Sequence, residues 1–136
     1  MGGPQVIILD THTWVWWVSN PEKLSAPARE RIEKAVINKD IFISSISAWE
    51  AAMLTARGRL KLTMDVRDWI AKSEALPFLR FIPVTNQIAL KSVHLPGKLH
   101  SDPADRIIIA TAIIQEATLI TADEKILGYP HVETLW

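Results

Sequence analysis

The chain has no cysteine among its 136 residues. Disulfides, zinc–thiolate sites and thiol catalysis are therefore excluded, and a reducing compartment is compatible with this composition. No apolar run is long enough to span a bilayer, and the N-terminus lacks the basic segment and the apolar core of a signal peptide. We therefore expect a cytoplasmic protein with no membrane segment.

The chain also has no excess charge, since 15 basic residues balance 15 acidic residues and the formal net charge is zero. Proteins dedicated to duplex nucleic acid are usually basic, because contacts with phosphates dominate their affinity. Bound cations add positive charge that a residue count omits. The composition therefore weakens a generic nucleic-acid assignment without excluding it.

What the chain does contain is enough apolar sequence for one core. Hydrophobic residues make up 49% of the chain and charged residues 22%, which fits a single domain over residues 1–136. The first four residues, Met-Gly-Gly-Pro, are expected to be a cloning remnant or disordered. No repeat, low-complexity tract or long linker divides the sequence.

Strand-like and helix-like segments alternate, which favours an α/β fold with a largely parallel sheet. The expected strands span residues 5–9, 41–44, 81–84, 118–121 and 131–135. The expected helices span residues 11–19, 25–38, 47–57, 65–75, 85–93 and 104–116, with a helical turn at 123–127. Most of these helices follow a Ser, Thr or Asp that can cap their first turn.

Four acidic residues stand where one site could collect them. Asp10 and Asp123 each follow a strand-like run, Glu50 opens the helix after the second strand, and Asp105 opens the helix after the long loop. Ligands of open parallel sheets bind outside the carboxyl ends of the strands. Carboxylates at that edge can hold Mg²⁺ or Mn²⁺, which in turn supports hydrolysis of a phosphodiester. The pattern indicates a small metal-dependent nuclease.

Each of these acids also has a purely structural interpretation. Asp10 and Asp123 could cap the helices that follow them. Ser47 and Glu50 fit a capping box. Asp105 falls in the first turn of its helix, where the helix dipole favours an acid by about 0.3–1 kcal/mol. Capping alone does not explain why all four acids stand at the start of an element after a strand or the long loop.

Four motifs occur in order along the chain. They are Leu9-Asp10-Thr11-His12 with Trp14 and Trp17, the segment from Ser44 to Glu50, the segment from His100 to Arg106, and Thr121-Ala122-Asp123. Ile108, Ala110 and Ala112 extend the third motif. Together they resemble PIN-domain proteins, and more narrowly the VapC-like toxin ribonucleases of toxin–antitoxin pairs. The resemblance covers nearly the whole chain, from about residue 6 to residue 136.

The resemblance implies a PIN-like three-layer α/β/α fold around a central, mainly parallel sheet. It also implies a Mg²⁺- or Mn²⁺-dependent endoribonuclease that hydrolyses RNA, forms a homodimer and pairs with a small antitoxin protein. By position, Asp10, Glu50, Asp105 and Asp123 match the acidic catalytic site. The three aspartates are expected to bind metal directly, whereas Glu50 could bind through water or accept the proton of the attacking water. Asp102 could be a helix cap, a metal ligand or a group behind the ligands.

Hydroxyl and basic residues near the acids are candidates for contacts with the substrate. Thr11 and Thr121 match small hydroxyl residues that orient carboxylates or water. Lys98 in the long loop and Arg106 after it could hold RNA phosphates. These four residues complete the site expected from the resemblance and the motifs.

Trp14, Trp16 and Trp17 lie in one short segment. Such a cluster usually packs a core or a subunit interface, although stacking of an RNA base, worth about 1–3 kcal/mol, is an alternative. Trp16 should face away from the other two on a helix, so it is the better candidate for exposure or a partner contact. His12 and His100 could approach a substrate, but a solvated or core-bonded role is favoured for both.

Two other functions are compatible with the sequence. An aspartate-nucleophile phosphatase would use Asp10 after a strand, but those enzymes resemble Asp-x-Asp, and His12 stands at the second position here. A non-catalytic PIN-like module could bind RNA or a protein, although the intact set of four acids argues against it. Metal-dependent cleavage of RNA by the purified protein separates these classes.

Overall fold

Five parallel strands form the central sheet of the computed structural model, which describes residues 6–136. The strands are β1 (Ile7–Leu9), β2 (Ile41–Ser44), β3 (Leu79–Ile82), β4 (Thr118–Ile120) and β5 (Thr134–Leu135). Their order across the sheet is β3-β2-β1-β4-β5, and every adjacent pair is parallel. The expected α/β fold is therefore confirmed, while residues 1–5, including the start of the first predicted strand, lie outside the described residues.

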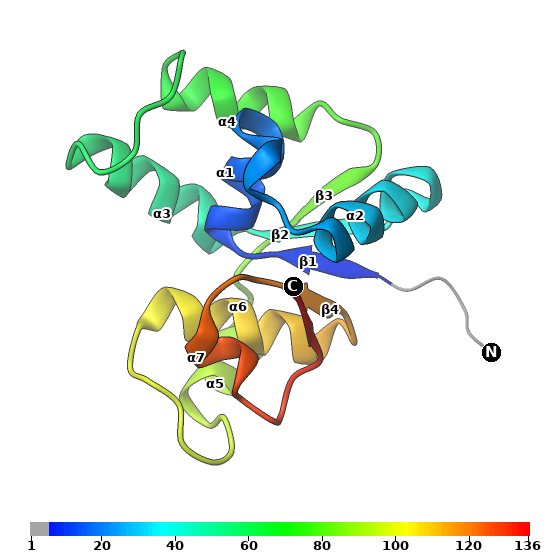
Figure 1. The fold of residues 1–136 in the computed structure, drawn as a ribbon. Helices are drawn as coiled ribbons and strands as arrows, with labels where there is room; N and C mark the ends of the chain where they lie inside the picture. The colour runs from blue at the N-terminus through cyan, green and yellow to red at the C-terminus, as the bar shows by residue number, and fades with distance from the viewer. Residues whose placement is uncertain (1–5) are drawn as a thin grey trace.

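Helices cover both faces of this sheet (Figure 1). One face carries α1 (Thr11–Ser19), α2 (Ala26–Asn38), α3 (Ser45–Ala56) and α4 (Val66–Glu74), with the short 3-10 helix η1 (Pro21–Lys23) after α1. The other face carries α5 (Asn86–Val93), α6 (Pro103–Ile114) and α7 (Glu124–Leu127). Among residues 6–136 no helix combines the length and apolar character needed to cross a membrane.

Alternating side chains of the strands divide the core into two layers. Ile7 and Leu9 of β1 pack in the layer under α1, α2 and α4, whereas Ile8 packs against α5 and α6. All three side chains are fully buried. Parallel strands that are buried on both faces have continuous apolar sequences, which explains why β1 could be recognised in the sequence.

Trp14 connects the start of α1 to the helix layer above it. Its ring centroid lies 4.4 Å from that of Trp69 in α4 and 5.5 Å from that of Phe81 in β3. Its indole N–H donates a hydrogen bond to Ser73 Oγ at 3.1 Å. These contacts fix the first turn of α1, which follows directly on Asp10.

Two predicted strands differ from the structure in their boundaries. The strand expected at residues 81–84 is β3, two residues earlier in the sequence. It ends before Pro83, because proline has no amide proton to give to a neighbouring strand. The strand expected at residues 131–135 is limited to β5, whose two residues pair with Leu119 and Ile120.

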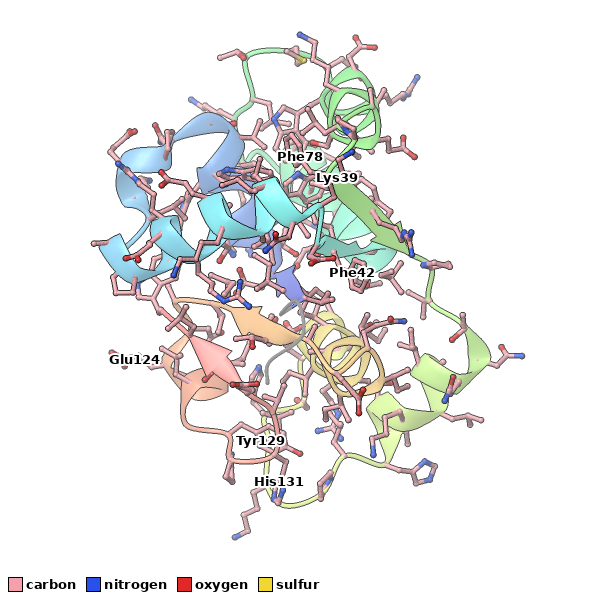
Figure 2. All side chains as sticks on the ribbon, turned by 90° about the vertical axis from the view of Figure 1, so that its right-hand side faces the viewer. Lys39, Phe42, Phe78, Glu124, Tyr129 and His131 are labelled. Atoms are coloured by element: carbon pink, nitrogen blue, oxygen red, sulfur yellow. The ribbon has the colours of Figure 1, made fainter. Side chains whose placement is uncertain are left out.

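The loop at residues 94–102, between α5 and α6, is held by contacts with a distant segment. The Tyr129 hydroxyl donates a hydrogen bond to the Pro96 carbonyl at 2.5 Å. Gly97 has a φ of +70°, and a Cβ at this position would lie 3.2 Å from Nε2 of His131. Tyr129 and His131 lie together at this end of the molecule (Figure 2). These contacts position the loop that leads into α6.

Replacing Ile8 with Ala should lower the free energy of unfolding by about 2–5 kcal/mol, because the change leaves a cavity in the central strand. Ile37→Ala is the matched control, since Ile37 is 80% exposed on α2, and it should change stability by less than about 0.5 kcal/mol. Urea denaturation measures both variants. Equal effects of the two substitutions would contradict the burial of Ile8.

Candidate active site

The strand order reverses between β1 and β4, which are neighbours in the sheet but distant in the sequence. Open α/β sheets bind ligands at such a point, outside the carboxyl ends of the strands. Asp10 follows β1 and Asp123 lies shortly after β4, so both acids are at this position. A cavity of about 370 Å³ opens there, and its lining residues are Asp10, Thr11, His12, Trp16, Glu50, Asp102, Asp105, Ala122 and Asp123.

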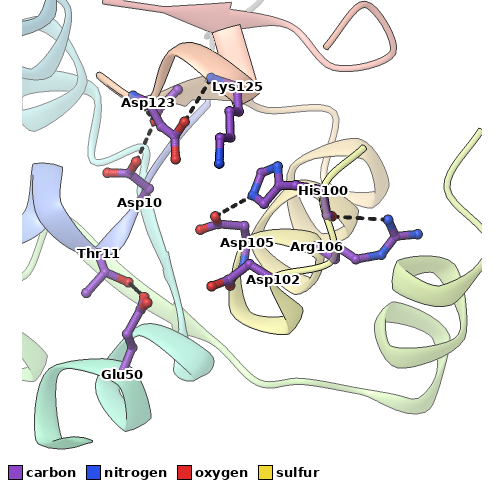
Figure 3. A network of polar contacts seen from close by, with 10 residues as sticks. Asp10, Thr11, Glu50, His100, Asp102, Asp105, Arg106, Asp123 and Lys125 are labelled. Atoms are coloured by element: carbon purple, nitrogen blue, oxygen red, sulfur yellow. Dashed lines mark hydrogen bonds and ion pairs between the residues drawn. The ribbon is translucent and has the colours of Figure 1, made fainter. Parts of the chain in front are cut away.

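The structure brings all four acids selected from the sequence into this cavity, and Asp102 joins them. Figure 3 shows their side chains around one opening, with Asp10, Glu50 and Asp105 contributed by different elements. Carboxylates gathered in this way repel one another when they are ionised, and a divalent cation relieves the repulsion. The arrangement is suited to binding a cation, whichever structural tasks the acids also perform.

Asp10 is only 7% exposed at the junction of β1 and α1. Its Oδ1 accepts a hydrogen bond from the Thr13 amide at 2.9 Å and so caps α1. Its Oδ2 accepts a hydrogen bond from the Thr121 hydroxyl at 2.5 Å. Each carboxylate oxygen has lone pairs for more than one partner, so capping does not exhaust the acceptor capacity of Asp10. Asp10 therefore caps α1 and can also bind a ligand in the cavity.

Asp123 also combines capping with a place in the cavity. Its Oδ1 accepts a hydrogen bond from the Lys125 amide at 2.9 Å, at the start of α7. Its own amide donates to Thr121 Oγ1 at 3.1 Å. The Thr121 hydroxyl thus connects the main chain of Asp123 to the carboxylate of Asp10, which is the geometry needed to orient an acid.

Glu50 lies in the second turn of α3, so its predicted position at the start of the helix, in a capping box with Ser47, is wrong. Ser44 caps α3 instead, because its Oγ accepts a hydrogen bond from the Ile46 amide at 3.1 Å. The Thr11 hydroxyl donates to Glu50 Oε1 at 2.5 Å, and Thr11 Oγ1 lies 2.9 Å from the buried Ser47 hydroxyl. Thr11 therefore holds the Glu50 carboxylate at the cavity.

Asp102 and Asp105 lie at the start of α6 and have different environments. Asp102 is the N-cap, and its Oδ1 accepts a hydrogen bond from the Asp105 amide at 2.9 Å. The Asp105 carboxylate instead meets His100, with Oδ2 2.7 Å from Nε2. Burial raises the pKa of Asp105 from 3.8 to about 6; the hydrogen bond with His100 opposes this rise, and the charges of Asp102 and Glu50 add to it.

His100 lies among the acids, where a solvated or core-bonded role had been favoured over contact with a substrate. Ligand atoms of His100, Asp105 and Asp123 all lie within 4.8 Å of one another, which is compatible with one metal ion. The sequence offers only a weak signal for this contact, because His100 comes from an irregular loop whose path depends on distant side chains.

Lys125 is a second neighbour of the acids that the sequence did not indicate. It lines a shallow hollow beside the main cavity with His100, Asp102, Asp105 and Asp123. Figure 3 shows its side chain directed between Asp123 and His100. Its position two residues after Asp123 could have indicated that it lies near the site. An exposed Lys in a short helix is too common, however, for the sequence alone to identify it as a site residue.

Arg106 and Lys98, the predicted phosphate ligands, are not among the described residues that line the acidic cavity. Arg106 Nε donates a hydrogen bond to the Ser92 carbonyl at 2.9 Å, and Nη1 donates to the His100 carbonyl at 3.5 Å. Its guanidinium points away from the acids in Figure 3. This geometry favours a structural role in which Arg106 ties the loop to the end of α5, while Lys98 is exposed in that loop.

A profile of the PIN domain matches residues 7–131 of the chain. The chain belongs to the PIN domain family. It is also 33% identical over 132 residues to Ribonuclease VapC22 of Mycobacterium tuberculosis (strain ATCC 25618 / H37Rv), a match that covers 96% of this chain and 98% of the relative. The resemblance inferred from the four motifs is therefore confirmed.

Solved structures of other proteins share this fold. A chain of DNA-bound VapBC from Salmonella typhimurium matches with a TM-score of 0.70 at 19% identity, over 97% of this chain and 98% of that chain. A chain of VapBC2 from Rickettsia felis, bound to a fragment of promoter DNA, matches with a TM-score of 0.71 at 19% identity, over 96% and 98%. At these identities the likeness establishes the three-layer fold alone.

The raised pKa of Asp105 predicts how its charge affects the stability of the metal-free protein. Below about pH 4 the carboxyl is protonated in both the folded and the unfolded chain. The folded state holds the proton up to about pH 6. The protonated group therefore adds to the free energy of unfolding at low pH, and this contribution is lost as the pH rises from about 4 to about 6.

Asp105→Asn should therefore match the wild type in stability at about pH 4 and exceed it by about 1 kcal/mol at about pH 7.5, after discounting for partial exposure. Asp68→Asn is the control, because Asp68 is an exposed acid of α4 outside the cavity. Thermal melting in EDTA at both pH values measures the effect. A loss of stability at the higher pH would show that the Asp105 charge serves the helix instead.

Proposed function

We propose that this protein is a VapC-type, metal-dependent endoribonuclease that hydrolyses RNA phosphodiester bonds and is the toxin of a toxin–antitoxin pair. The observation that carries the proposal is the cavity at the β1–β4 switch point, where Asp10, Glu50, Asp105 and Asp123 meet. A relative named as a ribonuclease, 33% identical over nearly the whole chain, supports the reaction. A toxin–antitoxin complex from Klebsiella pneumoniae, similar in fold with a TM-score of 0.59, supports a small protein partner.

The donor atoms in the cavity fit a hard divalent cation. Carboxylate oxygens suit Mg²⁺ and Mn²⁺, and Asp10, Asp105 and Asp123 would bind the ion directly, with Glu50 acting through water. When bound, the cation would polarise a phosphate oxygen and lower the pKa of a coordinated water. His100 orients the Asp105 carboxylate through their 2.7 Å contact. It also adds a nitrogen atom to the possible metal ligands of Asp105 and Asp123.

The side chains of the cavity are preorganised for proton transfer and phosphate binding. Thr11 occupies Glu50 Oε1, so Oε2 is the oxygen that would accept a proton from the attacking water. Thr121 fixes the carboxylate of Asp10 in the same way. Lys125 is a cation beside the acids and would contact a phosphate of the RNA. Groups held in place before the substrate binds need little reorganisation during the reaction.

The proposal extends to the organisation and location of the protein. We infer that residues 6–136 make one PIN domain and that it works in the cytoplasm, where its RNA substrate lies. An aspartate-nucleophile phosphatase is disfavoured, because those enzymes resemble Asp-x-Asp and His12 stands at the second position here. A neighbouring gene for a small DNA-binding antitoxin would support the toxin role over general RNA processing.

The purified protein should cleave RNA in the presence of Mg²⁺ or Mn²⁺ and stop when EDTA is added. Asp10→Asn and Asp105→Asn keep the side-chain size but remove a charge, so each should lower the cleavage rate by at least about 100-fold without unfolding the protein. Asp68→Asn makes the same change outside the cavity and should cut like the wild type.

Cleavage that is indifferent to EDTA, or full cleavage by Asp105→Asn, would refute this mechanism. If the wild type binds RNA but does not cut it under any of these conditions, the protein is instead a non-catalytic PIN module. A gel-based assay with structured RNA distinguishes these outcomes, provided that the preparation has been freed of any bound antitoxin.

We also propose a homodimer that uses the outer surface of α5. Leu90 is 63% exposed and Val93 is 69% exposed, and their spacing of three residues places them on one side of the helix. A small chain with a mean hydropathy of +0.13 has difficulty in hiding all of its apolar area. The tryptophan segment is a weaker alternative, because Trp14 is buried within the core.

Leu90→Glu combined with Val93→Glu should convert the dimer into a monomer at micromolar concentration, because the complex would have to bury unpaired charges. Ile37→Glu introduces a charge at an equally exposed apolar position on α2 and should leave the dimer intact. Sedimentation velocity reports the state of each protein. A monomeric wild type, or a dimer that survives the double substitution, would contradict this interface.

A further inference from the structure

Trp16 of α1 lines the acidic cavity together with the carboxylates. It is half-buried, whereas Trp14, two residues earlier, is fully buried in the core. Trp17 is also half-buried, but it packs against Phe78, with ring centroids 5.9 Å apart, and does not line the cavity. Trp16 is therefore the tryptophan of this segment whose surface is available at the site.

Neighbouring side chains hold the Trp16 ring in place. Its centroid lies 5.7 Å from that of Trp136 and 6.0 Å from that of His12. Lys23 Nζ lies over one face of the ring, 5.9 Å from the same centroid. A ring that is already held in one orientation loses little freedom when a ligand packs on it. Both His12 and Lys23 are exposed, so they add polar groups at the edge of the cavity.

Because the cavity is acidic, an uncharged aromatic ring is a suitable group there for binding RNA. Five carboxylates line it, and they repel the phosphates of RNA wherever a cation does not screen them. Stacking of a base on an aromatic ring does not depend on net charge, so it can attract RNA at an acidic site. The Lys23 ammonium next to the ring adds a positive charge for a phosphate on the same strand.

We propose that Trp16 is a stacking platform for one nucleobase of a single-stranded RNA segment, next to the phosphate that is cut. The inference rests on the proposed ribonuclease function and adds a binding residue to it. Every base has a π-face, so Trp16 contributes affinity and positions the strand without selecting a particular base. Lys23 binds the phosphate beside the stacked base.

The first measurement is the affinity for a short, fluorescently labelled, single-stranded RNA. All proteins carry Asp105→Asn, which prevents cleavage during the titration. Trp16→Leu should raise the Kd by about 5- to 150-fold, the range that loss of one stacked base produces. Trp16→Tyr should restore most of the affinity, and Trp17→Leu, which removes a neighbouring tryptophan outside the cavity, should leave the Kd unchanged. Thermal melting checks that each variant is folded.

The second measurement removes one base at a time from the same RNA. With Trp16 present, loss of the stacked base should weaken binding as much as Trp16→Leu does, and in the Trp16→Leu protein that loss should have no further effect. A merely structural role of Trp16 would not produce this coupling. If Trp16→Leu does not fold, the base scan on the protein with Trp16 still decides, because the absence of any sensitive position would overturn the proposal.

Several outcomes would overturn the stacking role. Equal affinities of the Trp16→Leu and Trp17→Leu proteins would do so, and so would base-removal effects that persist without Trp16. A Trp16→Leu defect confined to binding of the antitoxin would assign the ring to a protein partner. If the protein without Asp105→Asn cleaves RNA while Trp16→Leu leaves the affinity unchanged, stacking fails and the ribonuclease function stands; absence of both RNA binding and cleavage overturns both.

Discussion

The parallel pairing of β1 with β4 determines where Asp10 and Asp123 lie in the acidic cavity. Leu9 is opposite Ile120, so the chain leaves both strands at the same edge of the sheet and Asp10 meets Thr121. The Thr13 hydroxyl adds a second connection through its 3.0 Å hydrogen bond to the Ile120 carbonyl. A shift of one residue in this register would turn each side chain to the opposite face and separate these partners.

Some of the residues that cap helices in this protein also line the acidic cavity. Asp10, Asp102 and Asp123 each use one carboxylate oxygen to cap a helix, which fixes the carboxylate before any ligand arrives. Asp105 caps nothing, is half-buried, and has a pKa raised to about 6. Among the aspartates of the described cavity, Asp105 is the one whose carboxylate has no main-chain partner, so no amide donor offsets the effect of burial on its pKa.

Local sequence patterns predicted the fold class, the main elements and the four acids, because buried strands and helix caps are recorded in adjacent residues. Contacts between distant segments could not be predicted in this way. The Thr11–Glu50 hydrogen bond joins α1 to α3 across 39 residues. It takes the place of the contact that Glu50 was expected to make in a capping box with Ser47. Tyr129 and Arg106 bind the loop that brings His100 to Asp105, and neither contact leaves a periodic signal in the sequence.

The contact between Trp136 and Trp16 has a practical consequence. It places the carboxyl-terminal end of β5 and its following residue close to the cavity, whereas the amino end of β1 lies at the opposite edge of the sheet. Any polypeptide joined after Trp136 would emerge beside the region where RNA is expected to bind. An affinity tag or fluorescent fusion joined there would therefore compete with the substrate.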